Sequence, residues 1–216
     1  QRLQQVVINV AKLVNMRTDT DLRQDVLDSD IINIDGTGIL WAVRLLGHRV
    51  EERVAGVDLM EALIANCAQH GYKPYFLGAS AEVLEQAMTK LRADHPTLRI
   101  AGYRNGYFGE AEEEQVVAEI RNSGAHCLFV AISSPTKERF LRKHRDQLGV
   151  PFLMGVGGAL DVVAGKVTRA PVWMRHVGLE WLYRLAQEPR RMWRRYLVTN
   201  TIFLFLLLGE LARTWL

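Results

Sequence analysis

Short apolar runs alternate along this chain with longer segments of helical periodicity, and this alternation constrains the fold most. The segments between the runs, such as 58–71 and 80–96, carry apolar residues at the spacing of one helix face. Continuous apolar strands alternating with helices predict an α/β fold, with a Rossmann-like, mainly parallel sheet and helices on both faces. The runs are VVINV (6–10), IINI (31–34), PYFLG (74–78), LRIAGY (98–103), HCLFVAI (126–132) and VPFLMGVG (150–157).

The residues that punctuate the helical segments agree with this reading. Ser80 precedes AEVLEQAM as a helix N-cap residue would. Gly71, Gly124 and Gly149 follow helical segments, where glycine commonly ends a helix. The two cysteines, Cys67 and Cys127, lie inside apolar runs without disulfide or metal-ligand spacing, so we interpret both as core residues in a reducing compartment.

The pattern changes after Pro171. We expect an α/β catalytic domain over residues 1–171 and a helical appendage over residues 172–216, which contain no strand signal. Basic charge is concentrated at this change, because residues 169–196 hold seven arginines against two glutamates in a chain of net charge +3. Such a segment favours an anionic partner, namely nucleic acid, a phosphate-bearing ligand or an anionic membrane surface.

Aromatic residues are interleaved with these arginines, and an apolar run, residues 202–208, follows them. The run is too short to span a bilayer, which needs about 20 apolar residues. An Arg/Trp-rich helix leading into such a run is typical of an element lying in the membrane interface. The alternative is a C-terminal helix docked on the core or on a second subunit.

Several loops follow the strands at the sheet edge where α/β proteins bind ligands. Gly78 follows one strand, and the loop after strand 151–154 contains Gly155, Gly157 and Gly158. These glycines would let backbone N–H groups approach a phosphate in front of a helix N-terminus, or they could form tight turns. Together the loops favour a nucleotide-type ligand, although none matches a P-loop or the full dinucleotide fingerprint.

One carboxylate, Asp35, lies between the expected strand 31–34 and the helix that follows it, next to Gly36 and Gly38. It is either a helix N-cap or a general base that takes a proton from a hydroxyl nucleophile. The sequence DSD, residues 28–30, formally fits an Asp-x-Asp metal motif, but it precedes a strand at a polar helix end. We therefore predict no metal ligands.

The chain resembles the bacterial WecG/TagA/CpsF glycosyltransferases over nearly its whole length. The most specific matching stretches are long and lie late in the chain, in the order of the family. The matching stretches are DGTGI (35–39), ERVAGVDLM (52–60), YFLGAS (75–80), GYF (106–108), SSPTKE (133–138), GVGGALDVVAGKVTRAP (155–171) and GLEWLYRLAQEPRRMWRRY (178–196). The chain opens without a methionine and already enters a strand, so we expect that the family's short N-terminal portion is missing.

The resemblance implies an inverting transferase that needs no metal or other cofactor and has a Rossmann-like fold. It implies a UDP-sugar donor of the N-acetylmannosamine type or its uronate, and an acceptor sugar on undecaprenyl diphosphate, in surface polysaccharide synthesis. A UDP-glucose-dependent glucosyltransferase of exopolysaccharide assembly is the alternative. The enzyme is expected to be peripheral, at the cytoplasmic face of the bacterial inner membrane, with homo-oligomerisation left open.

The resemblance also assigns roles to residues. It makes Asp35 the catalytic base, with Asn9 and Arg53 in the substrate pocket. Arg184, Arg191 and Arg194 match the arginines that meet the acceptor's diphosphate. Guanidinium groups suit a diphosphate, and they can stabilise the departing UDP in place of a metal.

Two positions depart from the family pattern, and both bear on the sugar. Val7 replaces a common threonine, and Lys137 replaces a common glutamine. Lys137 could favour an acidic sugar or contact the donor phosphate. Three other classes stay open: a nucleic-acid-binding module, which lacks any recognisable domain, a nicotinamide-dependent oxidoreductase without its fingerprint, and an inactive member of the same family.

Overall fold

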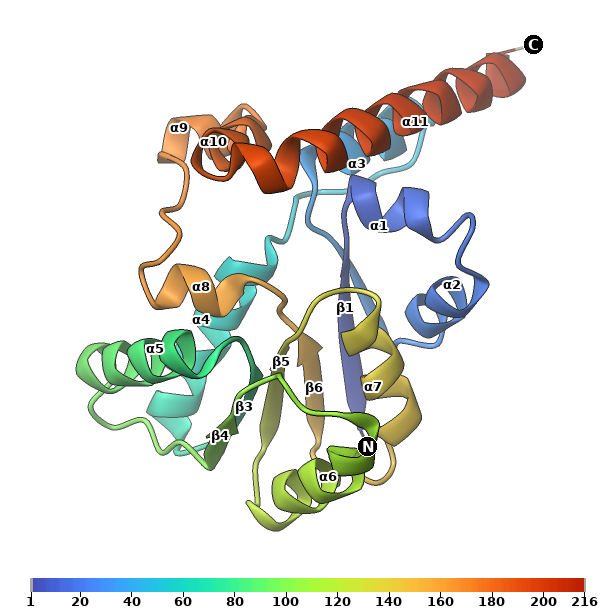
Figure 1. Cartoon of the computed structure of the whole chain (residues 1–216). Coiled ribbons are helices and arrows are strands. Elements are labelled where there is room, and N and C mark those ends of the chain that lie inside the picture. Colours follow the sequence, from blue (N-terminus) through green and yellow to red (C-terminus); the bar gives the residue numbers. More distant parts are fainter. Residues whose placement is uncertain (1, 216) are drawn as a thin grey trace. The chain divides into compact units, whose positions relative to one another are not determined.

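The computed structural model describes residues 2–215 of the 216-residue chain, and it is an α/β protein with one six-stranded sheet (Figure 1). The strands follow the order β2-β1-β6-β5-β3-β4. The pairs β1–β6, β6–β5, β5–β3 and β3–β4 are parallel. This confirms the predicted fold class. The strands are β1 (Leu3–Ile8), β2 (Ile31–Ile34), β3 (Pro74–Gly78), β4 (Gly102–Arg104), β5 (Cys127–Ala131) and β6 (Phe152–Gly155).

The helices lie where the periodicity predicts most of them. The short helix α1 was not expected, whereas α8 follows the glycine loop where a helix N-terminus was expected. The helices are α1 (Val10–Asn15), α2 (Thr20–Leu27), α3 (Thr37–Leu45), α4 (Gly56–His70), α5 (Ala81–Asp94), α6 (Glu113–Asn122), α7 (Thr136–His144), α8 (Ala159–Val163), α9 (Val172–His176), α10 (Glu180–Gln187) and α11 (Pro189–Trp215), with a 3₁₀ turn at Glu110–Glu112.

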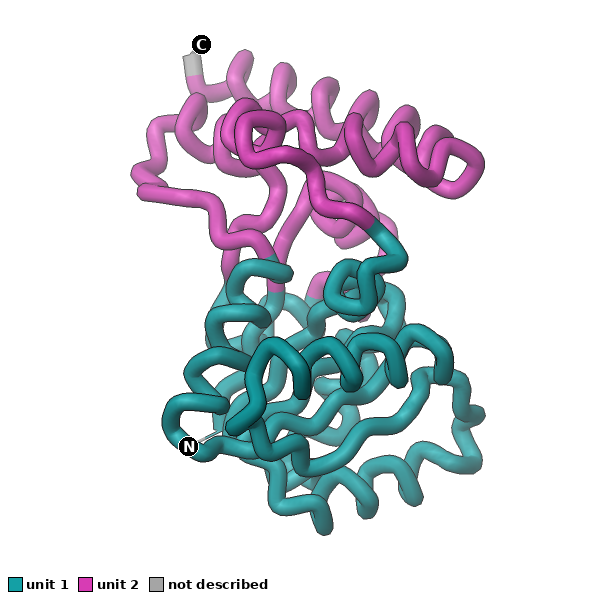
Figure 2. Tube along the Cα trace, turned by 90° about the vertical axis from the view of Figure 1, so that its left-hand side faces the viewer, with its two compact units in different colours: residues 1–6, 24–32, 56–167 teal, residues 7–23, 33–55, 168–216 magenta. Residues whose placement is uncertain are grey.

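By its internal contacts the chain divides into two compact units, which Figure 2 colours separately. Unit 1 comprises residues 1–6, 24–32 and 56–167, and unit 2 comprises residues 7–23, 33–55 and 168–216. Strands β1 and β2 begin in unit 1 and end in unit 2. The expected boundary after residue 171 stays a prediction.

The core of unit 1 shows why its strands read as continuous apolar runs. Successive residues of a strand point to opposite faces, and both faces of β3 are covered. Phe76 packs with α4, α5 and α8, whereas Tyr75 and Leu77 pack with α6 and α7. Cys67 and Cys127 are buried with Phe76, their Sγ atoms 3.5 Å apart as free thiols, which confirms them as core residues.

Most of the predicted helix signals are also confirmed. The Ser80 hydroxyl accepts a hydrogen bond from the Val83 amide, 3.4 Å, as an N-cap residue does. Gly71 and Gly124 follow the ends of α4 and α6 with φ values of +73° and +64°, in the left-handed region that glycine reaches without strain. Gly149 also has a positive φ, +69°, but α7 already ends at His144, so the prediction that Gly149 ends a helix was wrong.

In unit 2, residues 189–215 form one continuous helix, α11, rather than a helix followed by a short apolar run. Among the described residues, only Pro189–Thr214 is long and apolar enough to cross a membrane, and 6% of its most apolar window is buried. This differs from the expectation that the apolar run is too short, because the helix continues through Leu197, Val198 and the residues beyond Leu208. Length and composition alone are weak evidence for a span.

The C-terminal helices pack on the early part of the chain within unit 2. Helix α11 contacts α1, and a Cβ atom built at Gly38 on α3 would lie 3.8 Å from Phe203 Cε1. A Cβ at Gly178, between α9 and α10, would lie 2.7 Å from Thr37 Cγ2. Because Thr37 is the first residue of α3, the segment 168–216 is packed against the helix that follows Asp35.

Gly78, at the end of β3, gives the first prediction. Its φ is +129°, and a Cβ there would lie 2.4 Å from the Ala131 carbonyl carbon, so both strain and a backbone clash oppose any side chain. Gly78→Ala should destabilise the protein by about 3 kcal/mol in urea unfolding. Gly109→Ala is the control, because no atom lies within 4 Å of its Cβ position; equal stability of the two variants would contradict the account.

Candidate functional site

The loops that follow β1 and β2 meet in unit 2. The Asp35 amide donates a hydrogen bond to the Ile8 carbonyl, 2.9 Å. A Cβ built at Gly36 would lie 3.5 Å from both Cα and Cβ of Asn9. The fold therefore brings Asp35 beside Asn9, two residues that the sequence places 26 positions apart.

Asp35 is not the N-cap of the following helix. The N-cap is Gly36, with φ −90° and ψ 128°, which has no side chain to cap α3. The N-cap alternative for Asp35 is thus excluded. Its half-buried carboxyl group stands just outside a helix N-terminus, where the positive end of the helix favours the anion.

Asn9 does cap a helix. Its Oδ1 accepts a hydrogen bond from the Lys12 amide, 3.0 Å, at the start of α1. An asparagine that uses its carbonyl oxygen in this way keeps two N–H donors on the amide nitrogen. The cap therefore fixes the orientation of a side chain that can still donate to a hydroxyl.

Arg53 lies in the extended segment after α3. The next residue, Val54, donates its amide to the Ile34 carbonyl, 2.9 Å, which anchors this segment beside the end of β2. The Arg53 side chain is 17% exposed, and its Nη1 donates to Glu180 Oε2 at 3.1 Å. Hence Asn9, Asp35 and Arg53 all stand at the ends of β1 and β2 in unit 2.

The three C-terminal arginines also belong to unit 2, on α10 and α11. Glu188 lies between two of them, with its Oε1 3.0 Å from Arg191 Nη1 and its Oε2 3.8 Å from Arg184 Nε. Arg194 is exposed on α11. Sequence reasoning counted Glu180 and Glu188 only as charge; their position among seven arginines was the signal that could have marked them as ion-pair partners.

The remaining predicted residues belong to unit 1. Lys137 is buried, with its Nζ 2.8 Å from Glu138 Oε1. Its aliphatic stem lies over Gly155, where a Cβ would come within 3.0 Å of Lys137 Cδ and Cε. The positive charge of Lys137 is therefore already offset inside the protein.

The glycines around the end of β6 have defined backbone roles. Gly157, at φ +54°, directs its amide to the Val130 carbonyl at 3.3 Å, beside the Val156 amide at 2.9 Å. Gly158 is the N-cap of α8, a helix of five residues. A role for these glycines and for Gly78 in binding a substrate stays a prediction.

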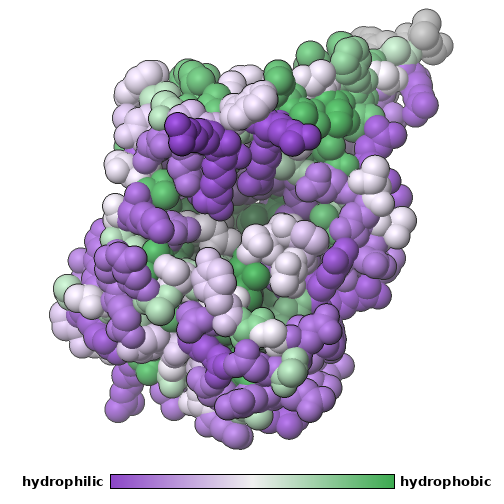
Figure 3. Space-filling model, viewed as in Figure 1, coloured by the Kyte–Doolittle hydropathy of each residue, from purple (hydrophilic) through white to green (hydrophobic). Residues whose placement is uncertain are grey.

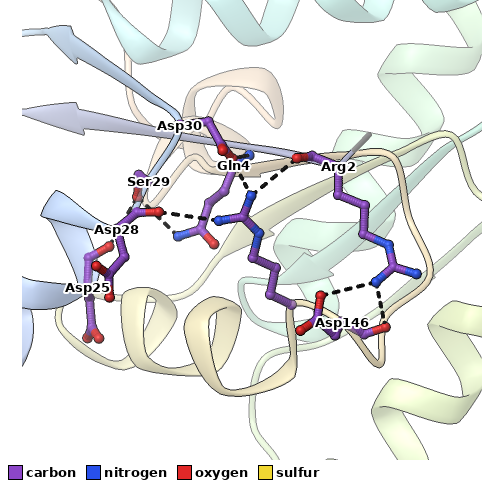
Figure 4. Close-up of polar contacts among 8 residues, drawn as sticks. Arg2, Gln4, Asp25, Asp28, Ser29, Asp30 and Asp146 are labelled. Atoms are coloured by element: carbon purple, nitrogen blue, oxygen red, sulfur yellow. Dashed lines mark hydrogen bonds and ion pairs between the residues drawn. The ribbon is translucent and has the colours of Figure 1, made fainter.

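The DSD segment forms a structural ion-pair cluster in unit 1 (Figure 4). Asp28 pairs with Arg142 at 3.3 Å, while Asp30 accepts from Arg145 and from the Gln4 amide, 2.7 Å. Arginine side chains thus pair with the carboxylates of both aspartates. Over residues 2–215 no group of three or more His, Cys, Asp or Glu side chains is placed to hold a metal.

The fold and this arrangement define a class of protein. It is a Rossmann-like α/β protein with a carboxylate at the end of a strand. Arginines lie in the same unit, as they do in sites that bind anionic substrates. The chain belongs to the WecG/TagA/CpsF family of glycosyl transferases, whose family model matches residues 1–215. It is therefore a glycosyltransferase of the kind that serves cell-surface polysaccharide synthesis.

The ion-pair cluster yields a pH prediction. The Gln4 amide, and then Arg145, lower the pKa of Asp30 below its ordinary value, so the charged form favours the folded state. This stability is present above the unfolded-state pKa of about 4 and is lost as pH falls toward the folded-state pKa. Asp30→Asn should lower the unfolding free energy by about 1 kcal/mol at pH 7 and by less at pH 3.

Urea unfolding at the two pH values measures the difference. Asp146→Asn is the matched control, because this carboxylate pairs with Arg2 in the same cluster but is 94% exposed. A pH-independent loss for Asp30→Asn would mean that its charge contributes nothing to folding.

Proposed function

We propose that this enzyme transfers a sugar from a UDP-sugar to a sugar on undecaprenyl diphosphate, with inversion and without a metal ion. The observation that carries the proposal is the placement of Asp35 beside Asn9 at the ends of β1 and β2, in a member of a glycosyltransferase family. One carboxylate is what an inverting transfer needs, because the acceptor hydroxyl loses its proton as it attacks the anomeric carbon.

Asp35 acts as the general base. Its backbone is fixed by the hydrogen bond to Ile8, and Gly36 and Gly38 add no side chains next to it. The carboxylate lies beside the N-terminus of α3 and accepts the proton of the attacking hydroxyl. Asn9 donates from its amide nitrogen to a sugar hydroxyl and so orients the substrate beside the base.

Arginines stabilise the phosphates in place of a metal. The leaving UDP gains negative charge as the bond between the donor sugar and its diphosphate breaks. Guanidinium groups that point at this charge lower the barrier. Arg53 serves the donor in this way. Arg184, Arg191 and Arg194 bind the diphosphate of the acceptor, for which a planar guanidinium fork is well suited.

The donor is a neutral N-acetylmannosamine-type sugar. A uronate donor would call for a cation whose charge is not already compensated. Lys137, the residue in which this chain departs from the family pattern, is paired with Glu138 and buried, so it offers little extra attraction for a sugar carboxylate. This reasoning makes the uronate the weaker candidate.

The enzyme works at the cytoplasmic surface of the inner membrane, where the polyprenyl tail of the acceptor lies. Hydrophobic colour gathers along the C-terminal part of α11 in Figure 3, and four arginines lie near the start of that helix. Its exposed apolar residues are Trp193, Leu197, Val198, Ile202, Leu204, Phe205 and Leu208. A helix that packs on α1 by one face and exposes an apolar face after a basic end suits an anionic membrane interface.

Asp35→Asn tests the catalytic assignment. The amide keeps the shape of the side chain but cannot accept a proton as a base, so turnover should fall at least about 100-fold. UDP release in the presence of acceptor measures turnover, and calorimetry should show UDP affinity within about twofold of wild type. Turnover within a few-fold of wild type would remove Asp35 as the base.

Leu204→Glu with Phe205→Glu tests membrane docking. Both side chains are more than half exposed, so the folded state should survive, while the lost apolar burial in lipid should weaken vesicle binding at least about tenfold. Co-sedimentation with vesicles that contain anionic lipid gives the bound fraction.

Leu27→Glu with Tyr72→Glu is the matched control, because both are exposed apolar residues of unit 1. Equal vesicle binding by the α11 variant and wild type would refute docking through this helix face.

A further inference from the structure

Glu180 sits between two arginines that come from distant parts of the chain. Its Oε2 accepts a hydrogen bond from Arg53 Nη1 at 3.1 Å, and its Oε1 lies 3.9 Å from Arg169 Nε. The three residues belong to the loop before α4, the segment before α9 and the first position of α10, all within unit 2. One carboxylate thus links three separate segments of unit 2.

The triad is largely shielded from water. Both arginine side chains are 17% exposed, and that of Glu180 is 31% exposed. Solvent screens such charges less than it screens surface pairs. Glu180 is also the first residue of α10, where the helix N-terminus favours a carboxylate, so the position of this anion is set by the backbone.

The shared carboxylate leaves most of the arginine donors unused by Glu180. A guanidinium group carries five N–H donors, and Arg53 gives one of them to Glu180. Without a common anion, two guanidinium groups would repel each other, and two long side chains would retain their rotamer freedom. With it, the two guanidinium groups are held close together by one carboxylate.

We propose that Glu180 is a positioning residue that holds Arg53 and Arg169 so that both donate to the diphosphate of the sugar-nucleotide donor. The inference rests on the proposed function, because that function supplies the diphosphate. It adds two residues, Glu180 and Arg169, to the donor site, and it gives the carboxyl-terminal segment a part in binding the donor as well as the acceptor.

Three possible roles of Glu180 predict different effects on diphosphate binding. If Glu180 occupied the place of the phosphate and had to be displaced, its removal would strengthen binding of a diphosphate. If Glu180 positions the arginines, its removal weakens that binding. If Glu180 served only the stability of the fold, its removal would not distinguish ligands with phosphates from ligands without them.

The experiment measures the affinity of the full chain for UDP and for uridine by calorimetry. Glu180→Gln should weaken UDP binding about tenfold and leave uridine binding unchanged, because the arginines contact only the phosphates. In steady state the donor KM should rise about tenfold, with the acceptor KM within twofold of wild type. Glu210→Gln is the matched control: Glu210 pairs with Arg213 at the exposed end of α11, and its loss should alter neither affinity.

Arg169→Gln is the second variant, and it decides the question even if Glu180→Gln does not fold. It should weaken UDP binding and spare uridine, because Arg169 is itself a donor to the phosphates. Unchanged or tighter UDP binding in either folded variant would overturn the positioning role, and so would an equal loss of UDP and uridine binding. Wild-type protein that does not bind UDP would overturn the proposed function itself, a result distinct from a failure of the variants alone.

Discussion

The hydrogen bond from the Asp35 amide to the Ile8 carbonyl, 2.9 Å long, is the contact on which the site depends. It joins the ends of β1 and β2 through backbone atoms alone, so no side chain takes part in it. It sets Asp35 beside Asn9, and a Cβ built at Gly36 would be in van der Waals contact with Asn9 at 3.5 Å. The segment that carries Arg53 then joins the end of β2 through Val54 and Ile34.

The C-terminal segment completes this arrangement from the other end of the chain. Thr37 meets the turn at Gly178, Gly38 faces Phe203, and Arg53 pairs with Glu180. Each of these contacts lies within a few residues of Asp35 or Arg53 in the sequence. The helices that expose apolar residues are therefore packed against the segments that carry the proposed base and its neighbouring arginine, within one compact unit. This coupling suits an acceptor whose sugar must reach the base while its lipid tail stays in the bilayer.

The sequence predicted β2, β3 and β5 closely and misplaced β1, which carries buried polar residues. Strands β3 and β5 lie within a residue of their expected positions, because every residue in them is buried. Strand β1 was expected at residues 6–10 but runs from Leu3 to Ile8, with helix α1 beginning at Val10. Gln4 and Gln5 are buried in that strand, and Gln4 donates to Ser29 Oγ at 3.1 Å. Because these buried residues are polar, the start of the strand has no apolar pattern to recognise.

The candidate site divides in the same way between what local sequence carries and what only the fold supplies. The motif around Asp35 marks the proposed base, and the charge count marks the basic segment. The pairing of Arg53 with Glu180 spans 127 positions and has no local signal, and the ion pair between Lys137 and Glu138 depends on their shared burial. Packing within the folded units, rather than the spacing of residues in the sequence, decides which charged side chains can meet a substrate.

The most direct test of the central claim is a transfer assay on the wild-type chain in EDTA. A panel of UDP-sugars is offered with a short-chain polyprenyl-diphosphate-linked N-acetylglucosamine, and the product is read by mass and anomeric configuration. We predict one acceptor-linked product of inverted configuration, formed best from UDP-N-acetylmannosamine at a rate that EDTA leaves unchanged. Product of retained configuration, or transfer that appears only when manganese is restored, would contradict a single carboxylate acting as base with arginines in place of a metal.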